Sequence, residues 1–395
     1  MHPVEIKPGV YYLGAQHWDR RLFDELIPLP DGTSYNSYLV LGERKTALID
    51  SVHPDKEDEL ISALEEMKIE RIDYLVSNHA EQDHSGAIPA ILDKYPEAKL
   101  VTNEKCKEFL EVHLGVEDSS FLTISDGEEL SVGGKTLQFI IAPWVHWPET
   151  MFTYLKEDKV LFTCDFLGSH LASTKAISNE DGRTYLAAKR YYAEIMMPFR
   201  EHVKRHLKRI RELDVEVIAP SHGPIYMNPE FILSAYEDWS SDDVKNQVTV
   251  AFVSMYGSTR KAIEVLVDAL LSEGIEEVHL FNLTEGDLGE MAMSLVDSAT
   301  LVIGTPAFLV GPHPVAAYFL SLVNSLRPKT RFVGVVSSFG WGSRVFDEVR
   351  SSLRNLRVEF LDPVLMRGFP REEDLSSVRS LARKIYERHK ELGIV

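Results

Sequence analysis

Cysteine is scarce in this sequence, and its scarcity excludes several classes of site. Only two cysteines, Cys106 and Cys164, occur among 395 residues. Two distant thiols cannot build a disulfide framework, a zinc ribbon or an iron–sulfur cluster. Such low cysteine usage is typical of a reducing compartment, and the sequence therefore predicts a cytoplasmic location.

The sequence also lacks long apolar runs and an excess of positive charge. No apolar run approaches the ~20 residues that a membrane helix needs. The first residues lack the basic and then apolar pattern of a secretory signal, so neither a membrane span nor a signal is expected. Lys and Arg number 42 against 61 Asp and Glu, which gives a net charge of −19. An acidic chain is repelled by nucleic acid and by anionic membranes, and neither is expected as a partner.

The length and the residue pattern predict two α/β domains, at residues 1–243 and 247–395. The acidic segment 236–243 interrupts the periodicity at the predicted boundary. The first half alternates strands and helices irregularly, with hairpin turns expected at Gly133-Gly134 and Glu157-Asp158. The second half alternates helices with five apolar runs, which predicts a doubly wound parallel sheet. These runs are residues 248–253, 277–281, 299–303, 332–336 and 357–360.

One short segment, His79-Ala80-Glu81-Gln82-Asp83-His84, holds four potential metal ligands. It follows a strand-like run and precedes a helix-like one, which is where α/β folds place reactive side chains. Two imidazoles and two carboxylates this close repel or desolvate one another unless a cation neutralises them. The alternative is a solvated polar loop, but further potential ligands downstream favour a metal site.

Three of these further ligands lie at or beside predicted strand ends. His146 lies in a loop between two strand-like runs, Asp165 ends the run 159–165, and His222 follows the run 215–219. Side-chain alternation along a strand directs Asp165 toward the site and Cys164 into the core. Each histidine alone would more often be structural, but seven candidates at strand ends indicate one metal centre. The histidines without such a context are expected at the surface: His53, His113, His202, His206 and His279.

The seven residues resemble the ligand pattern of the metallo-β-lactamase fold, and within that fold they resemble the flavodiiron proteins. Hydrolases of the superfamily usually carry a second histidine two residues after the first, and here that position is Glu81. A carboxylate moves metal preference from zinc toward harder, redox-active iron. The resemblance implies an αββα sandwich that holds two non-haem irons.

The family pattern also implies which side chains hold each iron. One iron would bind His79, Glu81 and His146; the other would bind Asp83, His84 and His222; Asp165 would bridge the two. The residues His170, Tyr191 and Tyr192 would line the pocket or support the ligands. Ordinary core or surface positions are an equal alternative for these last three.

A second site is predicted in the second half, at loops that leave the carboxyl ends of strands. Hydroxyls and free N–H groups at a helix start, as after the first apolar run, make a phosphate cradle. This loop lacks the Gly-Lys-Ser/Thr and G-x-G-x-x-G patterns, so neither a nucleoside triphosphate nor a dinucleotide is favoured. The alternative reading of this loop is a helix cap. With the loops after the third and fourth strands, the half resembles flavodoxin, which implies FMN. The residues assigned to FMN are Ser254, Met255, Tyr256, Gly257, Ser258, Thr259, Thr305, Pro306, Ala307, Phe308, Ser338, Phe339, Gly340, Trp341 and Gly342.

The two halves in this order resemble a flavodiiron protein of the minimal two-domain class over nearly the whole chain. The resemblance implies an oxidoreductase that reduces O2 to water, NO to N2O, or both, with a separate donor, expected to be a rubredoxin. It also implies a head-to-tail homodimer, or a dimer of dimers, in which each FMN lies beside the partner's irons. Two other functions stay open: a zinc hydrolase with an appended flavodoxin module, and an FMN electron carrier or redox sensor with a vacant metal site.

Overall fold

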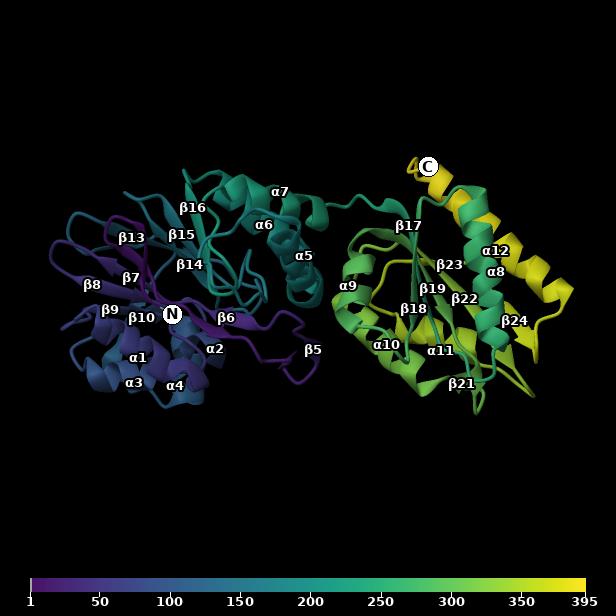
Figure 1. Cartoon of the computed structure of the whole chain (residues 1–395), viewed down its shortest axis with the longest axis horizontal. Coiled ribbons are helices and arrows are strands. Elements are labelled where there is room, and N and C mark those ends of the chain that lie inside the picture. Colours follow the sequence, from purple (N-terminus) through teal and green to yellow (C-terminus); the bar gives the residue numbers. More distant parts are fainter. Residues whose placement is uncertain (1) are drawn as a thin grey trace. The chain divides into compact units, whose positions relative to one another are not determined.

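The computed structural model describes residues 2–395, which form two compact units (Figure 1). One unit comprises the residues up to Tyr192 together with Phe199–Ser240, and the other comprises Ala193–Pro198 together with Ser241–Val395. The sequence predicts no interruption such as the short segment Ala193–Pro198. Across the described residues, no helix has both the length and the apolar character needed to cross a membrane.

The first unit is built on two sheets of seven and five strands. The larger sheet has the order β1 (Val4–Lys7), β2 (Val10–Tyr12), β7 (Tyr38–Leu41), β8 (Thr46–Ile49), β9 (Tyr74–Val76), β10 (Lys99–Asn103) and β11 (Phe121–Ile124). The smaller sheet has the order β12 (Glu129–Ser131), β13 (Thr136–Ile141), β14 (Met151–Leu155), β15 (Val160–Cys164) and β16 (Val217–Pro220). Two short pairs complete the strands: β3 (Ala15–His17) with β6 (Thr33–Tyr35), and β4 (Leu22–Phe23) with β5 (Ile27–Pro28). The two predicted hairpin turns are confirmed, because β12 pairs antiparallel with β13 and β14 pairs antiparallel with β15.

Helices cover the outer faces of these sheets and complete the predicted αββα sandwich. One core lies between the sheets and joins Val40 and Val76 of the larger sheet to Phe139 and Phe162 of the smaller one. A second core packs the other face of the larger sheet against α1, α3 and α4. The helices of this unit are α1 (Glu57–Glu66), α2 (Gln82–Ser85), α3 (Ile88–Lys94), α4 (Glu104–Leu114), α5 (Gly182–Tyr191), α6 (Arg200–Arg211) and α7 (Pro229–Ser240).

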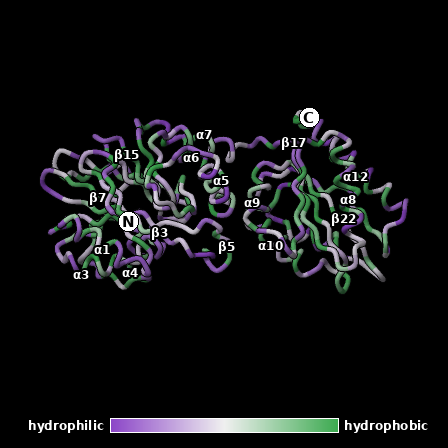
Figure 2. Tube along the Cα trace, in the orientation of Figure 1, coloured by the Kyte–Doolittle hydropathy of each residue, from purple (hydrophilic) through white to green (hydrophobic). Residues whose placement is uncertain are grey.

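The second unit is a parallel sheet covered by helices on both faces. Its main path is β18 (Glu277–Asn282), β17 (Lys245–Phe252), β19 (Ser298–Gly304), β22 (Phe332–Phe339) and β23 (Glu359–Phe360). This is the strand order of flavodoxin-like folds. The strands are largely hydrophobic along their length (Figure 2), as strands buried on both faces must be.

Two separate cores hold the helices of the second unit to the sheet. One core includes residues of α8 (Ser258–Glu273) and α12 (Glu372–Glu391). The other includes residues of α9 (Leu288–Asp297), α10 (Pro314–Leu326) and α11 (Val345–Ser352). The predicted fifth strand, 357–360, is shortened to β23, and a further strand that was not predicted, β24 (Val364–Arg367), pairs with another part of β22. The short pair β20 (Ala307–Phe308) and β21 (Gly311–Pro312) stands outside the main sheet.

Candidate metal centre and phosphate-binding loops

The segment that follows β9 directs four potential ligands into the interior of the first unit. Strand β9 ends at Val76, and the short helix α2 begins at Gln82. Within this turn both Asp83 and His84 are buried, and His84 Nε2 lies 3.3 Å from Asp83 Oδ1. The two adjacent side chains therefore turn inward together, as the predicted ligand pattern requires.

One group of potential ligands consists of His79, Glu81 and His146. Glu81 Oε2 lies 3.1 Å from His79 Nε2 and 3.2 Å from His146 Nε2. The side chains of Glu81 and His146 are 14% and 12% exposed, whereas His79 is fully buried. This group therefore forms the more exposed edge of the seven potential ligands, which are called the cluster below.

A second group consists of Asp83, His84 and His222, and all three are buried. His222 Nε2 lies 3.2 Å from Asp83 Oδ2. The ring centroids of His84 and His222 are 4.6 Å apart, so the two imidazoles approach the same point from different elements.

Asp165 lies between the two groups and presents one carboxylate oxygen to each. Its Oδ2 is 3.3 Å from His79 Nε2 and 3.4 Å from His146 Nε2. Its Oδ1 is 2.9 Å from His84 Nε2 and 3.4 Å from His222 Nε2. A carboxylate in this position has the geometry to bridge two cations.

The donor atoms fit a pair of metal ions on their own chemistry. Both carboxylate oxygens of Asp83 and Oδ2 of Asp165 are buried without a hydrogen-bond partner. Burial of carboxylate oxygens that accept no hydrogen bond is costly unless a cation compensates their charge. Four imidazoles and three carboxylates form a mixed nitrogen and oxygen donor set, which suits redox-active iron.

The electrostatics of the cluster show how strongly its groups interact. Burial disfavours the charged form of His146, but hydrogen bonds to Asp165 and Glu81 outweigh it and raise its pKa to about 9. Burial is likewise outweighed at His222, whose pKa rises to about 10 beside Asp165 and Asp83. For Asp83, burial is outweighed by the charges of His84 and His222, and its pKa falls to about 2.

Two of the three predicted supporting residues contact the cluster. The Tyr191 hydroxyl donates a hydrogen bond of 2.9 Å to Asp165 Oδ1. The ring of His170 packs 4.9 Å from that of His222, and burial lowers the pKa of His170 well below its usual range, so the ring is neutral. Tyr192 points elsewhere, because its hydroxyl donates to the carbonyl of Trp239 at 3.2 Å.

Sequence reasoning missed one residue of the cluster, Glu149. Its side chain is fully buried, and its Oε1 lies 2.6 Å from His79 Nδ1. The only sequence signal was a carboxylate three residues after His146, at the entrance to the apolar strand β14. The sequence around such a carboxylate predicts an ordinary turn residue, because its partner lies far away in the sequence.

The two cysteines and His206 were not predicted to bind metal. Cys106 and Cys164 are both buried and free, as packing residues should be. Cys164 also lies near His84 and Asp165, but burial raises the pKa of its thiol well above the usual range, so it is not a thiolate. The expected surface position of His206 is wrong: the residue is 2% exposed, and its Nε2 lies 3.1 Å from the Pro143 carbonyl oxygen.

The three loops predicted to bind FMN leave the carboxyl ends of adjacent strands, β17, β19 and β22. Gly257 has a φ of 87°, a left-handed conformation that glycine adopts easily, and it immediately precedes helix α8. Ser254 Oγ accepts hydrogen bonds from the backbone N–H groups of Gly257 and Arg260, at 3.1 and 3.2 Å, and holds the loop against the helix. The hydroxyls of Thr259 and Ser338 lie 3.1 Å apart and link the first loop to the third.

The aromatic side chains of these loops are unusually exposed. Tyr256 is 92% exposed, Trp341 is 79% exposed and Phe308 is 44% exposed. The third loop is shorter than predicted, since β22 continues through Phe339. A Cβ atom added at Gly340 would meet no heavy atom within 4 Å, so this loop leaves open space beside Trp341.

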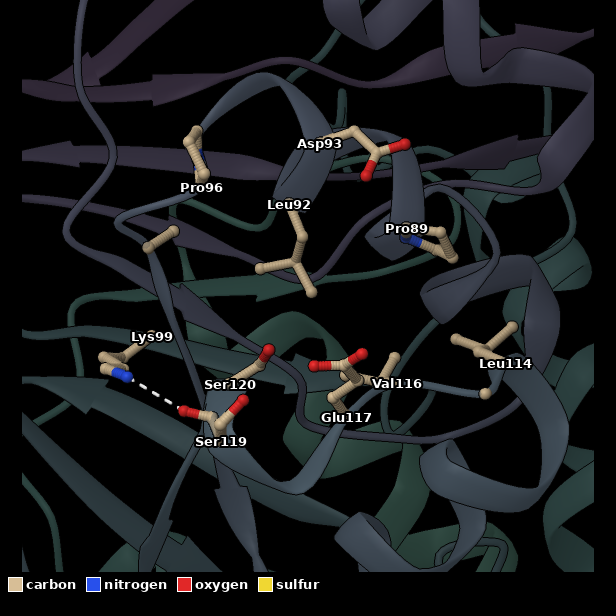
Figure 3. A pocket seen from close by; sticks show the side chains of 12 residues that line it. Pro89, Leu92, Asp93, Pro96, Lys99, Leu114, Val116, Glu117, Ser119 and Ser120 are labelled. Atoms are coloured by element: carbon tan, nitrogen blue, oxygen red, sulfur yellow. Dashed lines mark hydrogen bonds between the residues drawn. The ribbon is translucent and has the colours of Figure 1, made fainter.

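A surface cavity of about 500 Å³ lies elsewhere on the first unit (Figure 3). Side chains of α3 and α4 line it, together with Lys99, which donates a hydrogen bond of 2.9 Å to the Ser119 carbonyl. None of the predicted site residues contributes to this cavity.

The chain resembles known proteins over its whole length. A family model described as ODP family beta lactamase matches residues 33–223. The chain is 33% identical over 395 residues to the nitric oxide reductase of Moorella thermoacetica, and the match covers 98% of each sequence. Its structure matches the rubredoxin oxygen:oxidoreductase of Desulfovibrio gigas with a TM-score of 0.95 and 28% identity, over 99% of each chain. It matches the flavodiiron protein of Giardia intestinalis with a TM-score of 0.92 and 28% identity, over 98% of this chain and 97% of that one.

Proposed function

This chain belongs to the flavodiiron protein family, and we propose that it is an oxidoreductase that reduces O2 to water, NO to N2O, or both. A small external protein, such as a rubredoxin, provides the electrons. The observation that carries this proposal is the pair of ligand groups that share the two oxygens of Asp165.

The residues of the first unit would hold two irons. Metal position 1 is defined by His79, Glu81 and His146, and metal position 2 by Asp83, His84 and His222. Asp165 contributes one oxygen to each position. When bound, FMN supplies one-electron transfer, and the two irons supply the open coordination positions at which a diatomic gas accepts electrons.

The surrounding side chains fix the ligands and exclude water. The Tyr191 hydroxyl restrains Asp165 through Oδ1, the oxygen that faces metal position 2. His222 Nδ1 donates to the Ser34 carbonyl at 2.6 Å, which leaves its Nε2 free for a metal. Because most of the ligands are buried, water competes poorly with a small gas for the remaining positions.

The loops of the second unit would hold FMN by two kinds of contact. The start of α8 suits a phosphate group, because the helix dipole favours an anion there and no side chain of Gly257 caps the helix. The exposed rings of Tyr256 and Trp341 offer flat surfaces for an aromatic ring system. This assignment rests on loop placement and on the family, and it includes all fifteen residues given above.

The zinc hydrolase alternative is not favoured. Its usual second histidine is replaced by Glu81, which contacts both histidines of metal position 1. Two proteins that match over nearly the full length are named as a nitric oxide reductase, from Moorella thermoacetica, and a rubredoxin oxygen:oxidoreductase, from Desulfovibrio gigas. The vacant-site electron carrier is also not favoured, because all seven potential ligands are present and converge.

Metal and flavin analysis tests the proposal. Iron, zinc and FMN would be measured per chain in protein from iron-supplemented cells, and O2 and NO consumption would then be assayed with a reduced rubredoxin. Two irons and one FMN, with gas consumption, are expected. Zinc without iron would revive the hydrolase, and FMN without metal would leave only an electron carrier.

A further inference from the structure

Glu149 stands directly behind one metal ligand. Its carboxylate accepts a hydrogen bond from His79 Nδ1 at 2.6 Å and a second from the Ala80 backbone N–H at 3.2 Å. A carboxylate only accepts hydrogen bonds, so the proton of the neutral imidazole is on Nδ1. The lone pair of Nε2 therefore faces Glu81 and Asp165, at 3.1 and 3.3 Å, where the metal would lie.

Glu149 is itself held rigidly. The Asn103 side-chain amide donates to the Glu149 carbonyl at 2.7 Å, and Asn103 also caps the start of helix α4. The ring of Trp147 meets the His79 ring edge-on, with centroids 5.0 Å apart. Carboxylate, imidazole and neighbouring backbone thus form a preorganised unit in which His79 has little freedom to rotate.

The histidines of metal position 2 have no carboxylate behind them. The Nδ1 of His222 donates to a neutral backbone carbonyl, that of Ser34, and the Nδ1 of His84 has no hydrogen-bond partner among the described residues. A charged acceptor makes a stronger hydrogen bond than a neutral one and raises the basicity of the imidazole that donates to it. The two metal positions are therefore supported unequally.

We propose that Glu149 is a positioning residue that fixes the tautomer of His79 and makes metal position 1 the tighter of the two metal positions. This inference rests on the proposed di-iron function and adds to it an order of metal loss. Although the ligands of metal position 1 are the more exposed ones, Glu149 makes this position hold its ion longer, so metal position 2 releases its ion first.

Chelator kinetics on the full chain test the inference without any assay of gas reduction. Wild type, Glu149→Gln and Glu149→Ala would be loaded anaerobically with Fe(II) and mixed with an excess of a coloured Fe(II) chelator. Wild type should release its two ions in two phases. Glu149→Gln keeps an oxygen for both N–H donors but loses the charge, and it should accelerate the slow phase by about 10- to 100-fold. Glu149→Ala should accelerate it at least as much, while the fast phase stays unchanged in both variants.

A matched control separates this effect from a general loss of buried charge. Asp73 is another buried carboxylate of the first unit, and its Oδ2 accepts the Thr46 backbone N–H at 2.9 Å. Asp73→Asn should release both ions at wild-type rates. Two bound ions in wild type with unchanged slow release in Glu149→Gln would overturn the inference alone. Equal acceleration of both phases would also overturn it, and a wild type that binds no iron would instead contradict the proposed function.

Discussion

At the scale of single residues, Asp165 is the side chain on which the proposed metal centre depends most. Each of its carboxylate oxygens lies within 3.4 Å of two histidine nitrogens, one pair in each ligand group. The other carboxylates, Glu81 and Asp83, each serve one group only. Loss of Asp165 should therefore disturb both metal positions, whereas loss of another ligand should first affect its own.

We expect Asp165→Ala to lower O2 or NO reduction by about 100-fold or more and to reduce bound iron, because it removes the oxygen shared by the two positions. Gas consumption and iron per chain measure the effect. Asp214→Asn, at an exposed carboxylate of the same unit, is the control and should behave as wild type. Full O2 reduction by Asp165→Ala would remove the bridging assignment.

Only some of the residues of the candidate site could be predicted from the sequence. Ligand-type side chains at strand ends are visible in the sequence, and all seven converge. Glu149 and its partner His79 are 70 residues apart, so their contact has no local signature. His206 was misjudged for a similar reason, because Phe152 of a distant strand packs against its ring.

At the scale of elements, the start of helix α8 is the feature that the FMN proposal needs. Its first turn follows Gly257, which has a left-handed conformation and provides no side chain to cap the helix start. The carboxyl end of the same helix, at Glu273, has no role in the proposal. The start of α8 is therefore the proposed phosphate site, and its carboxyl end is a suitable place for a control substitution.

We expect Ser258→Asp to weaken FMN binding by about tenfold or more, because a fixed negative charge would repel the phosphate group at the helix start. Titration of flavin-free protein with FMN, followed by flavin fluorescence, gives the affinity. Ser272→Asp adds the same charge in the last turn of α8 and should leave FMN affinity unchanged. Equal affinities in the two variants would place the phosphate elsewhere.

A buried histidine of helix α12, His389, predicts that the free energy of unfolding depends on pH. The Asn246 amide nitrogen donates to the Gly274 carbonyl, so its oxygen accepts from His389 Nδ1, and Nε2 accepts from Thr300. The folded site therefore binds the neutral ring, and burial lowers the pKa of His389 to about 4. Well above pH 6.5 the His389 ring is neutral in both the folded and the unfolded protein. Between pH 6.5 and 4 the ring binds a proton in the unfolded protein but not in the folded one, so the free energy of unfolding falls as the pH falls.

The expected loss from His389 is on the order of 2 kcal/mol between pH 6.5 and 4. Urea unfolding of wild type and His389→Gln, followed by circular dichroism, measures it as a difference between the two proteins. Glutamine does not titrate, so the stability advantage of wild type should shrink across this pH range. A difference that stays constant with pH would show that His389 is not responsible.

At the scale of the whole molecule, the proposed reaction needs both units, one for each cofactor. The family resemblance implies a head-to-tail dimer in which the FMN of one chain serves the irons of its partner. In a symmetric dimer the same contact occurs twice, so two differently damaged chains can complement each other.

We expect an equal mixture of Asp165→Ala and Ser258→Asp chains, refolded or coexpressed together, to recover about a quarter of wild-type activity. Half of the dimers would be mixed, and each mixed dimer would retain one intact pair of sites. Gas consumption by the mixture and by each variant alone provides the measurement. Activity no higher than the sum of the two variants would favour transfer within one chain or a monomer.

The sequence by itself determined the order of the two folds, the seven potential ligands and the three loops of the second unit. It could do so because strand ends, helix starts and the pattern of apolar residues are local properties. Parallel strands end at the same edge of a sheet, so ligand-type residues at those ends converge without any detailed knowledge of packing.

Only the tertiary structure decided how these residues share their contacts. It gave each oxygen of Asp165 to a different ligand group, set Glu149 behind His79, and directed Tyr191 but not Tyr192 toward the cluster. It also shortened the last predicted strand of the second unit to β23 and placed a further strand, β24, beside β22. Each of these outcomes depends on side chains from segments far apart in the sequence, whose distances are fixed only when the sheets and helices pack.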